Sequence, residues 1–145
     1  MRQKLNAMPI EFNGRKVLLV VDTIVSGTTS REIVQIERES GAKNVFFASA
    51  APPVRFPNVY GIDMPTTAEL IAHDRSIDEI REFIGADALI YQDIAAMKRV
   101  VGALNPLVQG FEASCFDGQY ITGDVTAADV DAMAAQRRAP IDDED

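Results

Sequence analysis

Three short runs of mainly apolar residues recur along the chain, at residues 17–21, 45–50 and 88–91. Each run is too short for a helix and is typical of a strand that is covered on both faces, as in a parallel sheet. A shorter apolar stretch at residues 59–62 is a further candidate strand. Pro52 and Pro53 follow the second run and should end it, because proline cannot donate a hydrogen bond to a neighbouring strand.

Helices are predicted between and after these runs, each from a capping residue and an apolar face. Thr29 to Glu32 fits a capping box, with Ile33 and Ile36 on the buried side and Gly41 beyond the end. A second capping box begins at Ser76 and predicts a helix with Ile77, Ile80 and Ile84 on one face. Further helices are predicted to begin near Thr66, after Asp93 and near Thr126, and the one after Asp93 should end near Pro106.

Because strand and helix alternate from residue 17 to residue 104, the sequence predicts an α/β fold with an open parallel sheet and right-handed crossovers. Asp117-Gly118 lies between two short apolar segments and predicts a C-terminal β-hairpin over residues 114–121. We therefore divide the chain into a lead-in segment (1–16), the sheet domain (17–124), and a short helix with an acidic, disordered tail (125–145).

Composition restricts the partners of this fold. The chain has 145 residues, of which 47% are hydrophobic, enough for one compact core. A net charge of −8 repels polyphosphate surfaces, which argues against a nucleic-acid partner. The single cysteine, Cys115, cannot form an internal disulfide, and no apolar run is long enough to cross a membrane. We expect a cytoplasmic protein without a membrane partner.

The junction after the first predicted strand has the most distinctive chemistry. Ligands of open α/β sheets bind beyond the carboxyl ends of the strands, where Asp22 and Thr23 stand. The following turn combines a glycine with hydroxyl side chains beside the free amides of a helix N-terminus, which suits a phosphate group. It matches neither G-x-x-x-x-G-K-[ST] nor G-x-G-x-x-G. The candidate binding residues are Asp22, Thr23, Ser26, Gly27, Thr28, Thr29 and Ser30.

This junction resembles the motif that binds 5-phosphoribosyl 1-diphosphate in type I phosphoribosyltransferases: four apolar residues, two acids, Thr or Ser, and a G-T-T turn. Roughly residues 2 to 124 resemble the C-terminal part of glutamine amidophosphoribosyltransferase. The resemblance also rests on the segments 4–6 (KLN), 48–52 (ASAAP), 56–65 (FPNVYGIDMP), 69–73 (ELIAH), 84–87 (IGAD) and 116–118 (FDG).

The resemblance implies a partial type I phosphoribosyltransferase-like domain and the first committed step of de novo purine synthesis. In that reaction ammonia from glutamine displaces pyrophosphate from the Mg²⁺-bound phosphoribosyl donor and gives 5-phosphoribosylamine. By analogy, residues 27–30 hold the 5-phosphate, and Asp22 holds ribose hydroxyls near Mg²⁺. Some relatives carry an iron–sulfur cluster with four cysteines, which the single Cys115 cannot supply, so no cluster is expected.

Two positions depart from the family pattern: Val21 stands where an acid is expected, and Ser26 where arginine is common. Arg2 follows Met1, so the N-terminal cysteine that hydrolyses glutamine in the family has no counterpart there. We expect a lone chain that lacks the glutaminase part, with a missing upstream part or a homo-oligomer as possible partners. The alternative is a non-catalytic phosphoribosyl- or nucleotide-binding module.

Three other residues have a structural and a functional interpretation. His73 lies near a predicted helix end beside Asp74, which favours a partly exposed structural histidine over a catalytic base. Asp63 follows a predicted strand and precedes Pro65, where it could either contribute to a site or stabilise a turn. Cys115 is most simply a small packing residue.

Overall fold

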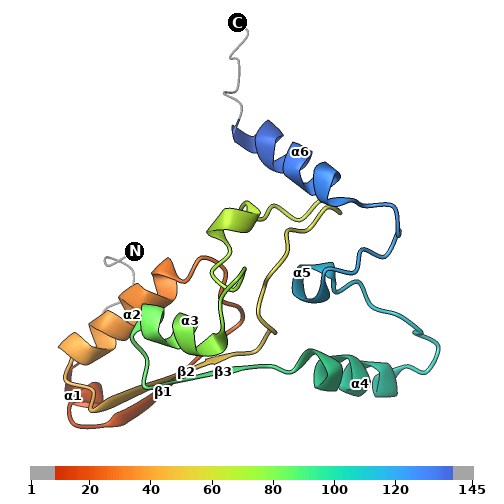
Figure 1. Ribbon diagram of the computed structural model, residues 1–145. Coiled ribbons are helices and arrows are strands. Elements are labelled where there is room, and N and C mark those ends of the chain that lie inside the picture. The colour runs from red at the N-terminus through yellow and green to blue at the C-terminus, as the bar shows by residue number, and fades with distance from the viewer. Residues whose placement is uncertain (1–8, 139–145) are drawn as a thin grey trace, which may run out of the picture.

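The computed structural model describes residues 9–138 of the chain. Three strands and six α-helices lie in these residues, together with one turn of 3₁₀ helix (Figure 1). In chain order the elements are α1 (Pro9–Phe12), β1 (Lys16–Val21), α2 (Thr28–Glu39), β2 (Asn44–Ser49), η1 (Thr67–Glu69), α3 (Ile77–Ile84), β3 (Ala88–Tyr91), α4 (Ile94–Leu104), α5 (Ser114–Asp117) and α6 (Ala127–Arg138).

The three strands form one open parallel sheet in the order β1-β2-β3, which confirms the predicted fold class. The register pairs Val20 with Ala48 and Ala48 with Ile90. The carboxyl ends of all three strands therefore point to the same edge of the sheet. Loops that follow the strands meet at that edge, which is where ligands of such sheets bind.

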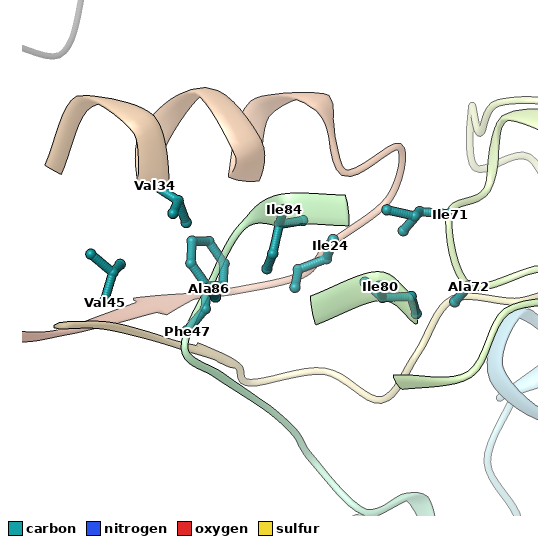
Figure 2. Close-up of a cluster of buried hydrophobic side chains, with 9 residues drawn as sticks. All are labelled: Ile24, Val34, Val45, Phe47, Ile71, Ala72, Ile80, Ile84 and Ala86. Carbon is teal, nitrogen blue, oxygen red and sulfur yellow. The ribbon is translucent and has the colours of Figure 1, made fainter. Parts of the chain in front are cut away.

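The core lies between the sheet and helices α2 and α3. Val45 and Phe47 of β2 are completely buried and point toward Val34 of α2 and Ile84 of α3 (Figure 2). Burying one side chain of this size contributes about 1.5 to 3 kcal/mol relative to leaving it exposed. This side-chain cluster fixes both helices on one face of the sheet.

Two helices begin as the sequence predicts. In α3 the Ser76 hydroxyl accepts from the Glu79 amide while the Glu79 carboxylate accepts from the Ser76 amide, and Gly85 ends the helix in a left-handed conformation. In α4 the Asp93 carboxylate accepts from the Ala96 amide at 2.7 Å. These caps satisfy amides that have no partner inside a helix.

The predicted strand at residues 59–62 is wrong. The side-chain oxygen of Asn58 accepts hydrogen bonds from the amides of Tyr60 and Ile62, at 2.8 and 3.3 Å. A local side-chain acceptor thus uses the donors that a strand would need. Gly61, at φ 94°, also departs from extended backbone. The helix predicted to begin near Thr66 is limited to the single turn η1, which starts with a capping box between Thr66 and Glu69.

The predicted hairpin at residues 114–121 is also wrong, because this segment contains the four-residue helix α5. Gly118 adopts a left-handed conformation and donates to the Ser114 carbonyl at 2.8 Å, which closes the helical turn. An Asp-Gly pair supplies the positive φ that a hairpin turn needs, but a helix end needs the same geometry. Lys98 of α4 then holds Asp117 by an ion pair of 2.6 Å.

The ends of the chain match the prediction in part. Helix α6 confirms the helix expected from Thr126, whereas α1 lies in a lead-in segment that was expected to be irregular. The predicted acidic tail at residues 141–145 lies outside the described residues, and the domain boundaries stay predictions. None of the helices within residues 9–138 is both long and apolar enough to span a membrane.

One charged side chain lies unexpectedly inside this fold. Glu37 of α2 is 7% exposed, and its Oε2 has no hydrogen-bond partner among the described residues. Burial raises the pKa of the Glu37 carboxyl above its ordinary value because the charged form loses hydration. The folded state therefore holds this proton more tightly than the unfolded chain does.

Replacing Glu37 with glutamine should weaken the pH dependence of stability. Below the unfolded pKa near 4.5 both states are protonated, and as pH rises through the raised folded pKa the folded state must bury a charge. The free energy of unfolding of the unmodified chain should therefore fall between pH 4.5 and 8 through this residue, and the variant should lack this fall. Urea titrations at both pH values measure the change. Glu39→Gln, at an exposed position of the same helix, is the control; equal slopes in both variants would contradict the assignment.

Candidate phosphate-binding site

A hollow of about 220 Å³ lies at the carboxyl end of β1, where the chain passes into α2. It brings together carboxylate, hydroxyl and backbone groups from one continuous segment. This is the edge of the sheet where a ligand is expected. The hollow is lined by Val21, Asp22, Thr23, Ile24, Val25, Ser26, Gly27, Thr29, Ser30 and Ile33.

The loop at residues 22–27 is fixed from below by the core. Ile24 is 1% exposed and packs in the same cluster as Ile71 (Figure 2). The Val25 carbonyl accepts from the Ile71 amide at 2.8 Å, and the Asp22 carbonyl accepts from the Ala51 amide at 2.9 Å. Two distant segments therefore hold the loop, so its polar groups are positioned before any ligand binds.

Gly27 is the residue on which the turn depends. It has φ 75° and ψ −13°, a left-handed conformation that glycine adopts without steric cost. A Cβ at this position would collide with the Ile71 side chain and lie 3.3 Å from the Phe83 ring. Glycine is thus favoured by the backbone conformation, and a larger residue here would force the Ile71 side chain to move.

The N-terminus of α2 is left without a side-chain cap. Gly27 occupies the N-cap position, and no carboxylate lies in the first turn, in contrast to the capped starts of α3 and α4. The first amides of α2 have no acceptor within the helix, and the helix dipole adds partial positive charge at this end. Such an arrangement favours an anion, and a phosphate group is the natural candidate.

The capping box predicted from Thr29 to Glu32 is wrong, because the N-cap of α2 is Gly27, two residues before Thr29, and the helix begins at Thr28. Thr29 lies within the first turn, so its hydroxyl does not cap the helix. The first-turn amides instead follow a glycine that has no side chain to offer them. Because Thr29 does not cap α2, the first amides of the helix remain available to a ligand.

Asp22 supplies the only carboxylate that lines the hollow. It is exposed, and its Oδ1 accepts from the Thr23 amide at 2.7 Å. The Thr23 hydroxyl is buried and has no hydrogen-bond partner among the described residues. A carboxylate and free helix amides around one hollow can hold a ligand that carries hydroxyl groups and a phosphate.

Positive charge lies near the loop but does not line it. The guanidinium groups of Arg31 and Arg75 lie 5.6 and 6.0 Å from the centroid of the Phe83 ring, the ring that also approaches Gly27. Neither arginine is among the residues of the hollow. Attraction for a phosphate inside it therefore rests on the α2 amides.

The structure groups six of the seven predicted binding residues around the hollow. Thr28 is the exception, because it is the first residue of α2 but does not line the hollow. Whether these residues bind a phosphoribosyl group stays a prediction. Sequence reasoning did not identify Ile71 as a support of the loop, and no local signal could have done so, since the contact joins segments far apart in the chain.

The other candidate residues lie elsewhere. His73 Nδ1 is 3.0 Å from the Arg55 carbonyl oxygen and Nε2 is 3.3 Å from Asp74, contacts that fit its predicted structural role. Asp63 does not line the hollow. Cys115 is partly buried, and burial is the main cause that raises the pKa of its thiol, in keeping with a packing residue.

The chain is thus an α/β protein with an open parallel sheet and an uncapped, glycine-containing turn after its first strand. Among curated proteins, the amidophosphoribosyltransferase of Haemophilus influenzae is 54% identical over 136 residues, which cover 94% of this chain and 27% of the relative. The Escherichia coli K12 enzyme of the same name is 53% identical, over 97% of this chain and 30% of the relative. No protein-family model matches the chain.

Solved structures agree with these relatives. The glutamine phosphoribosylpyrophosphate amidotransferase from B. subtilis, complexed with ADP and GMP, superposes with a TM-score of 0.68 at 34% identity over 89% of this chain and 30% of that one. The chain is therefore related to amidophosphoribosyltransferase, and the resemblance seen in the sequence is confirmed. It spans less than a third of the length of the relatives it matches.

Replacing Gly27 with alanine should destabilise the fold more than the same change at a glycine without neighbours. Strain at positive φ costs about 1 to 2 kcal/mol, and forced repacking around Ile71 adds about 1 to 3 kcal/mol. Gly123 is the matched control, because it has φ 73° and a Cβ added there would meet nothing within 4 Å, so it should show only the strain. Urea denaturation compares the two variants. Equal losses would show that the loop does not press against Ile71.

Proposed function

We propose that the chain supplies the part of an amidophosphoribosyltransferase that binds the ribose 5-phosphate of 5-phosphoribosyl 1-diphosphate. The complete enzyme would transfer ammonia derived from glutamine to this donor, forming 5-phosphoribosylamine and releasing pyrophosphate. The observation that carries the proposal is the placement of Asp22 and the uncapped start of α2 around one hollow. Identities of 53 to 54% to enzymes with this name support it.

In this proposal Asp22 and the start of α2 hold different parts of the sugar phosphate. The amides of Thr29 and Ser30 receive the 5-phosphate, with the hydroxyls of Ser26, Thr29 and Ser30 as further donors. The Asp22 carboxylate accepts hydrogen bonds from ribose hydroxyls. Charge-assisted hydrogen bonds of this kind contribute about 1.5 to 3 kcal/mol each.

The chain would promote the reaction by position rather than by a protein nucleophile. Departure of pyrophosphate leaves positive charge on the ribose ring, and a fixed carboxylate at the hydroxyls stabilises that charge. The rigid support by Ile24 and Ile71 keeps the sugar in one orientation, so the attacking ammonia meets a fixed carbon atom.

Mg²⁺ is the cofactor that we propose for this site. Mg²⁺ is held in such sites by one or two carboxylates, with water and substrate phosphates as the remaining ligands, and it would neutralise the departing pyrophosphate. Asp22 fits the role of one ligand. No group of three or more His, Cys, Asp or Glu side chains within residues 9–138 could hold a metal without substrate. Asp22 would therefore bind the metal together with the phosphoribosyl donor.

A non-catalytic binding module is the second candidate, and the character of position 21 favours it. Val21 lines the hollow and also packs against the core. It stands where the family pattern has a carboxylate. With one carboxylate the hollow could hold a sugar phosphate without supporting its reaction. The cytoplasmic location and the absence of an iron–sulfur cluster remain part of both proposals.

Calorimetric titration with 5-phosphoribosyl 1-diphosphate and Mg²⁺ tests the proposed binding. Asp22→Asn should weaken this binding about ten- to a hundredfold, because a charge-assisted hydrogen bond is lost. The same variant should bind inorganic phosphate as the unmodified chain does, since the phosphate is held by α2. Absence of binding in the unmodified chain would refute the proposal. An ammonia-dependent turnover assay then separates the enzyme from the module, which binds without turnover.

Restoring a carboxylate at position 21 should strengthen the site. Val21→Asp should tighten Mg²⁺-dependent binding of the phosphoribosyl donor about ten- to a hundredfold, at some cost in stability because Val21 packs against the core. Val21→Asn removes the same packing without adding charge and is the matched control in the same titration. Equal affinities of the two variants would show that charge at position 21 has no part in binding.

A further inference from the structure

Two arginines share one aromatic ring next to the candidate site. The guanidinium carbon of Arg31, in the first turn of α2, is 5.6 Å from the centroid of the Phe83 ring, and that of Arg75 is 6.0 Å from it. Phe83 belongs to α3, which lies beside α2 on one face of the sheet (Figure 1). Guanidinium groups at such distances are attracted to the face of an aromatic ring. The ring therefore gathers positive charge near the start of α2.

The Phe83 ring also borders the turn that leads into α2. A Cβ added at Gly27 would lie 3.3 Å from this ring. The Arg31 amide donates to the Gly27 carbonyl at 2.9 Å, and residues four apart lie on the same side of a helix. Long helical side chains lean toward the N-terminus of their helix, which brings the Arg31 side chain toward the turn. Arg31 is therefore beside the hollow, which Gly27 lines.

The charge of Arg31 is not offset by a neighbouring carboxylate. None of the residues three or four positions from it along α2 is acidic. Within residues 9–138 no ion pair joins Arg31 to an Asp or Glu side chain. Arg75 differs, because its Nη1 donates to the Ile71 carbonyl at 3.3 Å and its charge acts on Glu79. Arg31 is therefore the more available of the two cations.

An approaching phosphate group meets mainly negative charge on this protein. The chain has a net charge of −8, and the Asp22 carboxylate lines the hollow itself. The positive end of the α2 dipole acts only within about one turn of the helix start. A cation beside the hollow offsets the repulsion without touching the ligand, because exposed charges interact over about 10 Å at 0.1 M salt.

We propose that Arg31, held by the Phe83 ring, captures the phosphate group of the ligand and guides it to the start of α2. Arg31 then acts from beside the hollow, while the amides of Thr29 and Ser30 make the direct contacts. The inference rests on the proposed function for the position of the phosphate. It does not depend on the ribose or on a reaction, because inorganic phosphate carries similar charge.

Titration with inorganic phosphate tests this role, since inorganic phosphate lacks the ribose that Asp22 would bind. The ¹⁵N NMR signals of the Thr29 and Ser30 amides report binding at this helix start. At an ionic strength of about 0.01 M, Arg31→Gln should weaken phosphate binding about three- to tenfold. At about 1 M salt the difference should disappear, because the screening length falls from about 30 Å to about 3 Å.

Two further variants separate charge from structure. Arg99→Gln is the matched control, because Arg99 is an exposed arginine of α4 that does not line the hollow, and its loss changes the net charge equally. It should leave phosphate binding nearly unchanged. Arg31→Lys keeps the charge and should bind phosphate as the unmodified chain does. Equal weakening in Arg31→Lys and Arg31→Gln, or in Arg31→Gln and Arg99→Gln, would overturn the proposal.

The part played by the ring is measured by a double-mutant cycle. Phe83→Leu keeps an apolar side chain but removes the aromatic face, so Arg31 loses its support and phosphate binding should weaken. In the Arg31→Gln background the same change should have a smaller effect, because the side chain that the ring positions is gone. Additive losses would show that Phe83 does not act through Arg31.

The results distinguish this inference from the proposed function. Phosphate binding that does not depend on Arg31, together with binding of 5-phosphoribosyl 1-diphosphate, would overturn the inference and leave the function standing. Phosphate binding that depends on Arg31, without binding of 5-phosphoribosyl 1-diphosphate, would do the reverse. Unchanged Thr29 and Ser30 signals on addition of phosphate would overturn the inference, since Arg31 would then have no anion site to serve.

Discussion

The contact between the loop at residues 22–27 and the segment before α3 is the constraint on which the candidate site depends. The Ile71 amide donates to the Val25 carbonyl, Ile24 packs beside Ile71, and a Cβ at position 27 would displace the Ile71 side chain. Because the turn is held from behind, its amides and the Asp22 carboxylate keep their arrangement without a ligand. Binding then costs less ordering entropy than it would in a free loop.

The same core explains why function is concentrated at one end of a small sheet. Phe47 and Val45 fix α2 over the sheet, and the N-terminus of α2 therefore lies next to the end of β1. The position of that helix start converts an uncapped turn into an anion site. A helix of the same sequence with a serine or aspartate at its N-cap would satisfy its own amides and offer less to a phosphate.

Helices of the described residues cover one face of the sheet and leave the other face exposed. Helices cover the face that contains Phe47, while Leu18, Val20 and Ile90 present apolar surface on the opposite face. The hollow shows a similar asymmetry, with a carboxylate and free amides but no cationic side chain among its lining residues.

Much of the local structure could be predicted because its causes are local. Short apolar runs identified β1, β2 and β3, and the capping box predicted at Ser76 formed. The errors occurred where one local signal serves two structures. Gly118 provides a positive φ that ends α5 instead of turning a hairpin, and the Asn58 side chain takes the amides expected to belong to a strand.

The sequence by itself determined the fold class, the relation to amidophosphoribosyltransferase and six of the residues that line the hollow. These follow from continuous stretches, in which the order of apolar, acidic, hydroxyl and glycine residues carries the information. Only the tertiary structure decided that Ile71 supports the loop, that α2 starts without a cap, and that no helix of residues 9–138 covers the face of Leu18 and Val20. Each of these depends on contacts between distant segments, and the 3.6-residue and 2-residue periodicities of a sequence do not specify which distant segments meet.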